Sequence, residues 1–301
     1  MTRAGFVTLI GRPNVGKSTL VNAMVGAKVT ITARSPNTTR HAVRGVVSQG
    51  DVQVILVDTP GLHRPRTALG GRLNDVARAS LDGVDVVLAL IDAGGAIGPG
   101  DQSVIVTALE ALNRSVGLRG AVVVNKVDRV GREAVARQLM AASEEVRAIA
   151  AERGLDAAGE RLEYFAISAA QGTGVDQLLD YLRGAMPESP FLFPADELSD
   201  VPEAAWIAEL VREQLVRKTS QELPHSIHCR VSEFEWPHVS VDILVERESQ
   251  KGMVIGKGGQ LLKDVGIAAR RQLPEGIFLE LRVAVEPGWQ RRDDALDRFG
   301  Y

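Results

Sequence analysis

Residues 11–19 of the sequence read GRPNVGKST, and their types and spacing are those of a phosphate-binding loop. Gly11 to Ser18 match the pattern G-x-x-x-x-G-K-[ST], with an apolar run before it and a helical pattern after it. Glycines let backbone N–H groups turn toward phosphate oxygens, and the N-terminus of the following helix adds a favourable dipole. Lys17 would reach the β- and γ-phosphates, and Ser18 would bind Mg²⁺. A simple glycine turn would not require all of these residue types, so we favour a nucleotide site.

The segment DTPGL, residues 58–62, follows a second apolar run and supplies further groups for the phosphates. Asp58 would hold Mg²⁺ through water, and the backbone amide of Gly61 would contact the γ-phosphate. Many small GTPases orient the attacking water with a glutamine directly after this glycine. This chain has Leu62 there, which cannot orient water, so we expect slow unaided hydrolysis.

Two more segments select the base. In NKVD, residues 125–128, Asp128 can accept both the N1 proton and the 2-amino group of guanine, which adenine does not offer. Asn125 would tie this segment to the first loop, and the stem of Lys126 would cover the base. In SAA, residues 168–170, a backbone N–H can donate to guanine O6. Each segment ends a predicted strand, where open α/β sheets bind their ligands, so the sequence predicts GTP binding.

The polar segment 32–45 is the predicted position of a threonine that closes on Mg²⁺ when GTP is bound. Thr38 and Thr39 are the candidates, and Thr39 is favoured because it stands nearer the following strand. The alternative is an ordinary polar surface loop. The predicted metal ligands are therefore Ser18, Thr39 and Asp58.

The catalytic group is not identified by the sequence. Its candidates are Asn14, Lys17, Thr39 and Gly61. The Asn14 carbonyl could help to hold a monovalent cation such as K⁺ against the phosphates, or it could only stabilise the loop, and both interpretations stay open. The predicted nucleotide-binding residues are Gly11, Arg12, Pro13, Asn14, Val15, Gly16, Lys17, Ser18, Thr19, Thr38, Thr39, Asp58, Thr59, Pro60, Gly61, Leu62, Asn125, Lys126, Val127, Asp128, Ser168, Ala169 and Ala170.

A second glycine-rich loop, VIGKGGQLL, carries G-x-x-G at residues 256–259 between two helical patterns. This placement resembles a type II KH domain, in which the loop grips the backbone of about four single-stranded nucleotides. Lys263 and Arg270 are seven residues apart and share a face of the following helix. The predicted RNA-binding residues are Gly256, Lys257, Gly258, Gly259, Lys263 and Arg270. The alternative is a small α/β domain that docks another protein.

The elements around these loops predict two folds. Short apolar runs at 6–11, 52–58, 84–92, 120–126 and 164–168 alternate with helical patterns, which is typical of a mostly parallel α/β sheet with helices on both faces. The run before residue 52 adds an antiparallel edge strand through a hairpin. From residue 204 onward, the order α-β-β-α-α-β predicts an α+β domain.

The predicted domains are a GTP-binding domain at 1–185, a type II KH domain at 204–287 and a tail at 288–301. Between them, residues 186–203 form an acidic linker rich in proline. The tail would either cover the RNA or the KH surface, or form a solvated helix. We weigh both equally.

Composition excludes several classes of protein. The 301 residues carry a formal net charge of −3, so any nucleic acid must bind a local patch of positive charge. One cysteine, Cys229, permits no intrachain disulfide. The N-terminal residues lack the apolar core of a signal peptide, and the most apolar stretch, residues 84–98, is too short to span a bilayer.

With both loops the whole chain resembles the Era family of bacterial ribosome-assembly GTPases. The stretches that carry this resemblance are GRPNVGKSTL, PNTTRH, DTPGLHRPRTALGGRLND, NKVD, VIGKGG and the terminal W…RDD…L…GY. The resemblance implies GTP hydrolysis with Mg²⁺ and a KH domain that binds a single strand near the 3′ end of 16S rRNA. It also implies the 30S ribosomal subunit as partner, and a cytoplasmic location with peripheral association to the inner face of the cell membrane. We expect a monomer.

Three other classes of protein share some of these motifs. GTPases that help to modify tRNA share PNVGKS and a TTR segment but carry a helical domain in place of G-x-x-G between helices. A tandem GTPase is excluded because only one set of motifs is present. A pure binding module would bind nucleotide only for structure. Our hypothesis is that GTP orders segments 32–45 and 58–72, shifts the GTP-binding domain against the KH domain and uncovers the RNA surface, and that hydrolysis reverses this.

Overall fold

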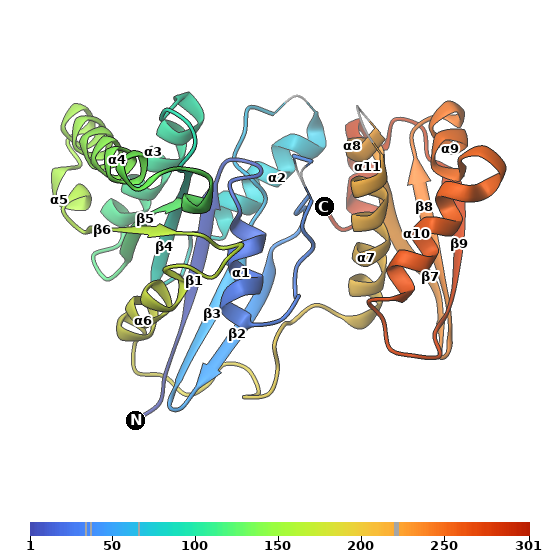
Figure 1. Cartoon of the computed structure of the whole chain (residues 1–301), viewed down its shortest axis with the longest axis horizontal. Coiled ribbons are helices and arrows are strands. Elements are labelled where there is room, and N and C mark those ends of the chain that lie inside the picture. Colours follow the sequence, from blue (N-terminus) through green and yellow to red (C-terminus); the bar gives the residue numbers. More distant parts are fainter. Residues whose placement is uncertain (34, 37, 66, 220–222) are drawn as a thin grey trace. The chain divides into compact units, whose positions relative to one another are not determined.

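A six-stranded sheet organises the N-terminal part of the chain in the computed structural model (Figure 1). The structure describes residues 1–33, 35–36, 38–65, 67–219 and 223–301. The sheet has the order β2-β3-β1-β4-β5-β6, in which only β2 is antiparallel to its neighbour. Its strands are β1 (Arg3–Gly11), β2 (Val43–Gln49), β3 (Val52–Asp58), β4 (Val86–Asp92), β5 (Arg119–Asn125) and β6 (Leu162–Ile167). Each predicted strand is present, and the hairpin between β2 and β3 turns at Gly50, with φ 61°.

Helices cover both faces of this sheet, as the uninterrupted apolar strands require. One hydrophobic core joins the sheet to α1 and α6, and another joins it to α3 and α4. The helices of this part are α1 (Lys17–Val25), α2 (Ala68–Ala79), α3 (Pro99–Arg114), α4 (Arg132–Arg153), α5 (Asp156–Gly159) and α6 (Val175–Ala185). The predicted doubly covered α/β sheet is confirmed.

The segment predicted as a linker packs against the first sheet, at β1 and β3 in its first part and at the β2 edge in its last part. Val46 N–H donates to Leu198 O at 2.9 Å, and the side chain of Gln53 donates to Phe193 O at 2.9 Å. Arg44 forms an ion pair with Asp200 at 2.6 Å. These contacts hold residues 186–200 on the first compact unit, and the bond from Val46 satisfies a backbone group that an edge strand leaves open.

The C-terminal part is an α+β unit whose main elements follow the predicted order α-β-β-α-α-β (Figure 1). Its sheet has the order β7-β8-β9, with β7–β8 antiparallel and β8–β9 parallel. Helices α7 and α10 pack on it around one hydrophobic core. The elements are α7 (Glu203–Lys218), α8 (Leu223–Ser226), β7 (His228–Glu235), β8 (His238–Val245), α9 (Glu248–Ile255), α10 (Gln260–Arg270), β9 (Phe278–Val285) and α11 (Asp293–Arg298). Ser220 and Gln221, the end of the predicted helix, lie outside the described residues.

The C-terminal tail is a packed part of this unit, so the solvated helix considered as one alternative is wrong. Trp289 is completely buried and its indole N–H donates to Ser226 O at 3.0 Å. Phe299 stacks on His228 with ring centroids 4.3 Å apart, and His228 Nδ1 lies 2.8 Å from the Tyr301 hydroxyl. A fully buried indole with a satisfied N–H anchors the tail.

The two compact units interleave along the sequence. The first comprises Met1–Thr30, Thr39–Pro65 and Arg72–Asp200, and the second comprises Ile31–Thr38, Arg66–Gly71 and Val201–Tyr301. A short segment between α1 and β2 therefore belongs to the unit that contains α7, which nothing in the sequence indicated.

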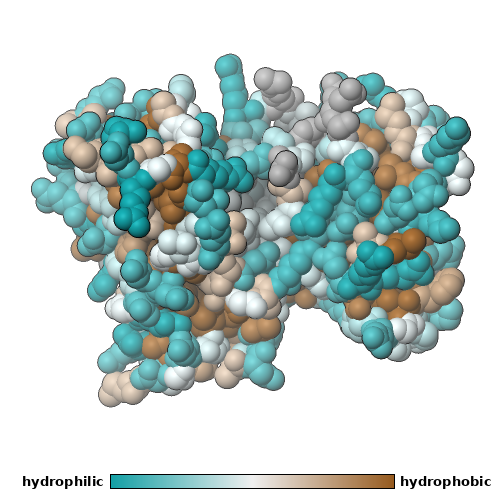
Figure 2. All heavy atoms as spheres, viewed as in Figure 1, coloured by the Kyte–Doolittle hydropathy of each residue, from teal (hydrophilic) through white to brown (hydrophobic). Residues whose placement is uncertain are grey.

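Hydrophilic side chains cover most of the face seen in Figure 2, with smaller hydrophobic areas between them. Across the part of the chain that the structure describes, no helix combines the length and apolarity needed to cross a membrane.

Candidate nucleotide site and RNA-binding loop

The phosphate loop joins the end of β1 to the start of α1 and has the conformation that its sequence predicts. Asn14 and Gly16 have positive φ, 64° and 106°. A side chain at Gly16 would place its Cβ 2.3 Å from Asn125 Nδ2. Both this close contact and the positive φ therefore require glycine at this position. Lys17 Nζ donates to Gly11 O at 3.1 Å and to Arg12 O at 3.3 Å across the loop. Burial lowers the pKa of Lys17 to about 8, although the nearby carboxylate of Asp58 opposes this shift.

Three oxygen-bearing side chains meet beside this loop, and they are the three predicted metal ligands. Ser18 Oγ lies 2.9 Å from Thr39 Oγ1, which donates to Asp58 Oδ2 at 3.3 Å. Thr30 also donates to Asp58 Oδ2, at 2.8 Å. Burial raises the pKa of Asp58, against the opposing effect of the Lys17 charge and the hydroxyl donors.

The second Asp58 oxygen, Oδ1, is buried and has no hydrogen-bond partner within the described residues. Hydroxyl and carboxylate oxygens are ligands that Mg²⁺ prefers, so this donor set fits the ion. Ser18, Thr39 and Asp58 would hold the ion, which would supply positive charge to the nucleotide phosphates. The Thr38 hydroxyl instead donates to Ser35 O at 2.7 Å, which favours Thr39 over Thr38 as the ligand.

The D-x-x-G segment is pinned directly against the phosphate loop. The Leu62 amide donates to Gly11 O at 3.1 Å, and a Cβ on Gly61 would lie 2.6 Å from Pro13 N. The Leu62 side chain is buried in the core that α3 and α4 share. The position that carries glutamine in many GTPases is thus part of the core, which agrees with the expectation that the water-orienting group comes from elsewhere.

Asn125 connects three loops of the candidate guanine site. Its Nδ2 donates to Val15 O at 2.9 Å, the predicted tie to the first loop. Its Oδ1 accepts from the amides of Lys126 at 2.8 Å and Ala169 at 3.0 Å. Because the Ala169 amide is used in this way, Ala170 is the remaining candidate donor to guanine O6.

Asp128 and Lys126 stand on either side of this junction. Asp128 Oδ1 accepts from Ser168 Oγ at 2.6 Å, which orients the carboxylate expected to bind guanine. Lys126 Nζ donates to Asn14 O at 2.6 Å and to Asp92 Oδ2 at 2.7 Å, so it bridges the phosphate loop to the end of β4.

Two acidic residues that support the site were not predicted. Asp92 holds Lys126, and Asp101, almost completely buried in the first turn of α3, forms an ion pair with Arg12 at 2.9 Å. Asp92 ends a predicted strand, which is a usable signal. Asp101 lies in no motif, and only the fold brings it to Arg12.

The G-x-x-G loop joins α9 to α10 in the conformation that glycine favours. Gly256, Gly258 and Gly259 all have positive φ, between 61° and 79°. Among the described residues, no atom other than those of the adjoining chain lies within 4 Å of a Cβ built on Gly258 or Gly259, so a strand of RNA could approach this backbone closely. Lys257 on the loop is exposed, and so are Lys263 and Arg270 on α10.

A phosphate loop and guanine-reading segments at one edge of a mostly parallel sheet define a P-loop GTPase, here joined to a KH domain. The family model described as "50S ribosome-binding GTPase" matches residues 6–126, and the "KH domain" model matches residues 222–290. The chain belongs to the Era family and is a GTPase, with guanine nucleotide and Mg²⁺ as its ligands.

Similarity to members of this family extends over the whole chain. GTPase Era of Mycobacterium tuberculosis is 46% identical over 312 residues, which cover 99% of this chain and 98% of that protein. GTPase Era of Mycobacterium avium is 44% identical and covers 99% of both chains.

Two solved structures are similar over the same extent. A crystal structure of Era with MgGDPNP and nucleotides 1506–1542 of 16S ribosomal RNA has a TM-score of 0.89 at 34% identity. A variant of Aquifex aeolicus Era bound to GDP and AlF4⁻ has a TM-score of 0.88 at 34% identity. In both cases the match covers 100% of this chain and 99% of the other.

Proposed function

We propose that this GTPase binds single-stranded 16S rRNA near its 3′ end through the KH domain, in a manner gated by its nucleotide, and thereby assists biogenesis of the 30S subunit. The observation that carries the proposal is similarity over the full chain to an Era structure that contains a GTP analogue and a 16S rRNA fragment. The open glycine backbone at 258–259, flanked by exposed cations, supports RNA as the ligand of the second loop.

The proposed nucleotide site comprises the phosphate loop 11–19, Thr38 and Thr39, segment 58–62, segment 125–128 and segment 168–170. Ser18, Thr39 and Asp58 are the proposed Mg²⁺ ligands, and their convergence around an unpartnered buried oxygen supports this assignment. The group that orients water is proposed among Asn14, Lys17, Thr39 and Gly61.

We also propose that K⁺ binds beside Asn14, held by the side-chain carbonyl of that residue. The Asn14 backbone carbonyl accepts a hydrogen bond from the positively charged Lys126 Nζ at 2.6 Å, which favours the side-chain carbonyl as the ligand of a cation.

The proposed RNA contacts are the backbone of 256–259 with Lys257, and the exposed side chains of Lys263 and Arg270. We further propose domains at 1–185 and 204–287 joined by residues 186–203, with the tail 288–301 supporting the second. A monomer in the cytoplasm, with peripheral contact to the inner face of the membrane and the 30S subunit as partner, completes the proposal.

A titration with a fluorescent single strand that copies the 3′ end of 16S rRNA tests the function. The protein is loaded with a non-hydrolysable GTP analogue or with GDP, and a scrambled strand serves as control. We expect tight, sequence-dependent binding only with the GTP analogue. Equal and weak binding to both strands in both nucleotide states would refute it. A matched variant, Lys257→Ala with Lys263→Ala, should weaken RNA binding and leave nucleotide affinity unchanged.

A further inference from the structure

A side-chain amide on α2 holds the residue that follows the D-x-x-G segment. His63 N–H donates to Asn74 Oδ1 at 3.3 Å, and Asn74 Nδ2 donates to His63 O at 2.7 Å. Both residues belong to the first compact unit, and Asn74 is buried. Because both backbone groups of His63 are bonded to one amide, the position of this residue relative to α2 is fixed.

The imidazole of His63 in turn holds the peptide group between Gly61 and Leu62. His63 Nδ1 lies 2.9 Å from Gly61 O, and since a carbonyl oxygen can only accept, the ring nitrogen is the donor. The other side of this peptide group is the Leu62 N–H, which donates to Gly11 O at 3.1 Å. The peptide plane is therefore held at both of its polar ends.

The held peptide group lies directly against the phosphate loop. Gly11 O also accepts from Lys17 Nζ at 3.1 Å, so the D-x-x-G segment and this lysine share one acceptor. A Cβ on Gly61 would lie 2.6 Å from Pro13 N. Among the described residues the Gly61 N–H has no hydrogen-bond partner, so it can donate to a phosphate oxygen beside the loop.

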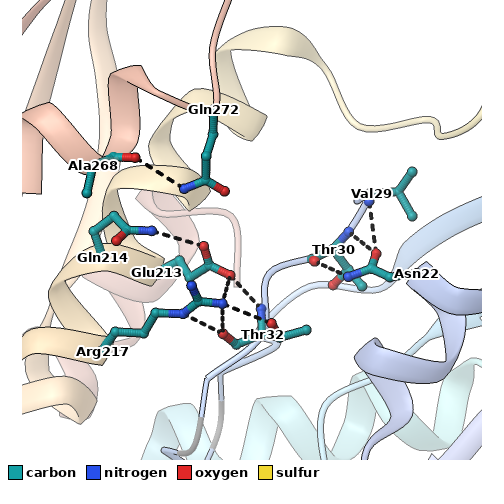
Figure 3. Close-up of polar contacts among 9 residues, drawn as sticks. All are labelled: Asn22, Val29, Thr30, Thr32, Glu213, Gln214, Arg217, Ala268 and Gln272. Atoms are coloured by element: carbon teal, nitrogen blue, oxygen red, sulfur yellow. Dashed lines mark hydrogen bonds and ion pairs between the residues drawn. The ribbon is translucent and has the colours of Figure 1, made fainter. Parts of the chain in front are cut away.

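A second asparagine of this unit, Asn22 on α1, makes the same pair of contacts. Figure 3 shows its side chain engaged with the backbone of Thr30, whose N–H donates to Oδ1 at 3.0 Å and whose C=O accepts from Nδ2 at 2.8 Å. The hydroxyl of Thr30 then donates to Asp58 Oδ2 at 2.8 Å. In both cases an asparagine fixes the backbone of one residue, and the side chain of that residue contacts the D-x-x-G segment. The segment is thus held near both of its ends, at Asp58 and at Gly61.

We propose that Asn74 and His63 are positioning residues that orient the Gly61 amide toward the γ-phosphate of GTP. This role rests on the proposed contact of segment 58–62 with that phosphate, and it adds two residues outside the segment. GDP has no γ-phosphate, so loss of either contact should weaken the binding of GTP more than that of GDP. Hydrolysis should also slow, because it requires the γ-phosphate in a defined position.

The test uses the full-length protein with Mg²⁺. It measures the ratio of affinities for a non-hydrolysable GTP analogue and for GDP, together with the single-turnover rate of GTP hydrolysis. His63→Phe keeps a ring but removes the donor to Gly61 O, so the ratio and the rate should each fall about fivefold. His63→Asn places an amide N–H close to the position of Nδ1 and should restore both to within about twofold of the wild type. A role of side-chain bulk alone would give the opposite order.

A matched pair of variants on α2 tests the other positioning residue. Asn74→Ala removes both contacts to the His63 backbone and should lower the ratio about tenfold. Asp75→Asn is an isosteric change at the exposed neighbouring position and should leave the ratio within about twofold of the wild type. Asn74 is buried, so its replacement also lowers stability, but the ratio compares two ligands of the same folded protein and is not changed by a general loss of stability.

Gly61→Ala distinguishes a failure of the proposed nucleotide site from a failure of the positioning residues. Its Cβ would push the segment away from Pro13, so the ratio should fall if segment 58–62 contacts the γ-phosphate. An unchanged ratio in this variant would refute that contact, and with it the role of Asn74 and His63. A lower ratio in Gly61→Ala, combined with an unchanged or raised ratio in His63→Phe and Asn74→Ala, would overturn the positioning role alone. An equal loss of affinity for both nucleotides in those two variants would overturn it as well.

Discussion

Replacement of Asn125 tests whether one buried amide holds the three loops of the nucleotide site together. The side chain is almost completely buried and makes three hydrogen bonds, to Val15 O and from the amides of Lys126 and Ala169. Asn125→Ala leaves the Val15 carbonyl and the Ala169 amide buried without their partner. Since an unsatisfied buried group costs about 1–3 kcal/mol, and the half-buried Lys126 amide can recruit water, we expect a loss of about 3 kcal/mol in the free energy of unfolding.

The isosteric variant Asn125→Asp refines this estimate. The carboxylate can still accept from both amides, but it loses the donor to Val15 O and places a buried negative charge beside that carbonyl, so we expect a loss of at least about 3 kcal/mol, no smaller than that of Asn125→Ala. Asn113→Ala, at an exposed position in α3, is the control and should change stability by less than about 0.5 kcal/mol.

Urea unfolding of the nucleotide-free protein measures the stability, and release of a fluorescent nucleotide measures the site. Because none of the three bonds involves the position of the γ-phosphate, GTP and GDP affinities should fall by the same factor. Unchanged stability in Asn125→Ala, or a loss confined to GTP, would refute the view that this amide acts by joining the loops.

Three further changes have defined outcomes. Leu62→Gln should not accelerate hydrolysis in a single-turnover GTPase assay, because the side chain lies in the core. The same variant should lower the free energy of unfolding by about 2–4 kcal/mol. Faster hydrolysis would contradict the buried placement of residue 62. Asp92→Asn removes a partly exposed ion pair with Lys126, which is worth about 1 kcal/mol after solvent screening. Stopped-flow fluorescence should therefore show roughly fivefold faster release of both GTP and GDP. Trp289→Phe should lower the free energy of unfolding by about 2 kcal/mol, since it removes the indole N–H that donates to Ser226 O and opens a cavity; thermal unfolding checks this, and an unchanged midpoint would argue that the tail is not anchored there.

The sequence predicts those parts of the site whose residues lie close together in one motif. Gly16 and Lys17 are read from one short pattern, and Asp58 follows a strand whose apolar run is unbroken. The order of elements around the G-x-x-G loop was likewise predicted, because apolar periodicity distinguishes strands from helices along the chain.

The sequence could not indicate contacts between residues far apart in the chain. Thr32 and Glu213 are 181 residues apart, and the hydrogen bond between them leaves no periodic signature in either segment. Asp101 is one acidic residue among many in the first turns of helices, and only the packing of α3 brings it to Arg12. The linker's attachment to β2 was missed for a related reason, since proline and acidic residues describe composition and carry no information about a neighbouring sheet edge.

The interleaving of the two compact units limits how the protein can be divided or recombined. A cut between Asp200 and Val201 would leave residues 31–38 in one fragment and helix α7, which contacts Thr32, in the other. The C-terminal fragment would then carry Glu213 without the Thr32 amide, so it would not reproduce the intact module. A chimera that receives a foreign KH domain would need a matching replacement of residues 31–38 to preserve the anchoring contacts. The exchangeable module is therefore discontinuous in sequence.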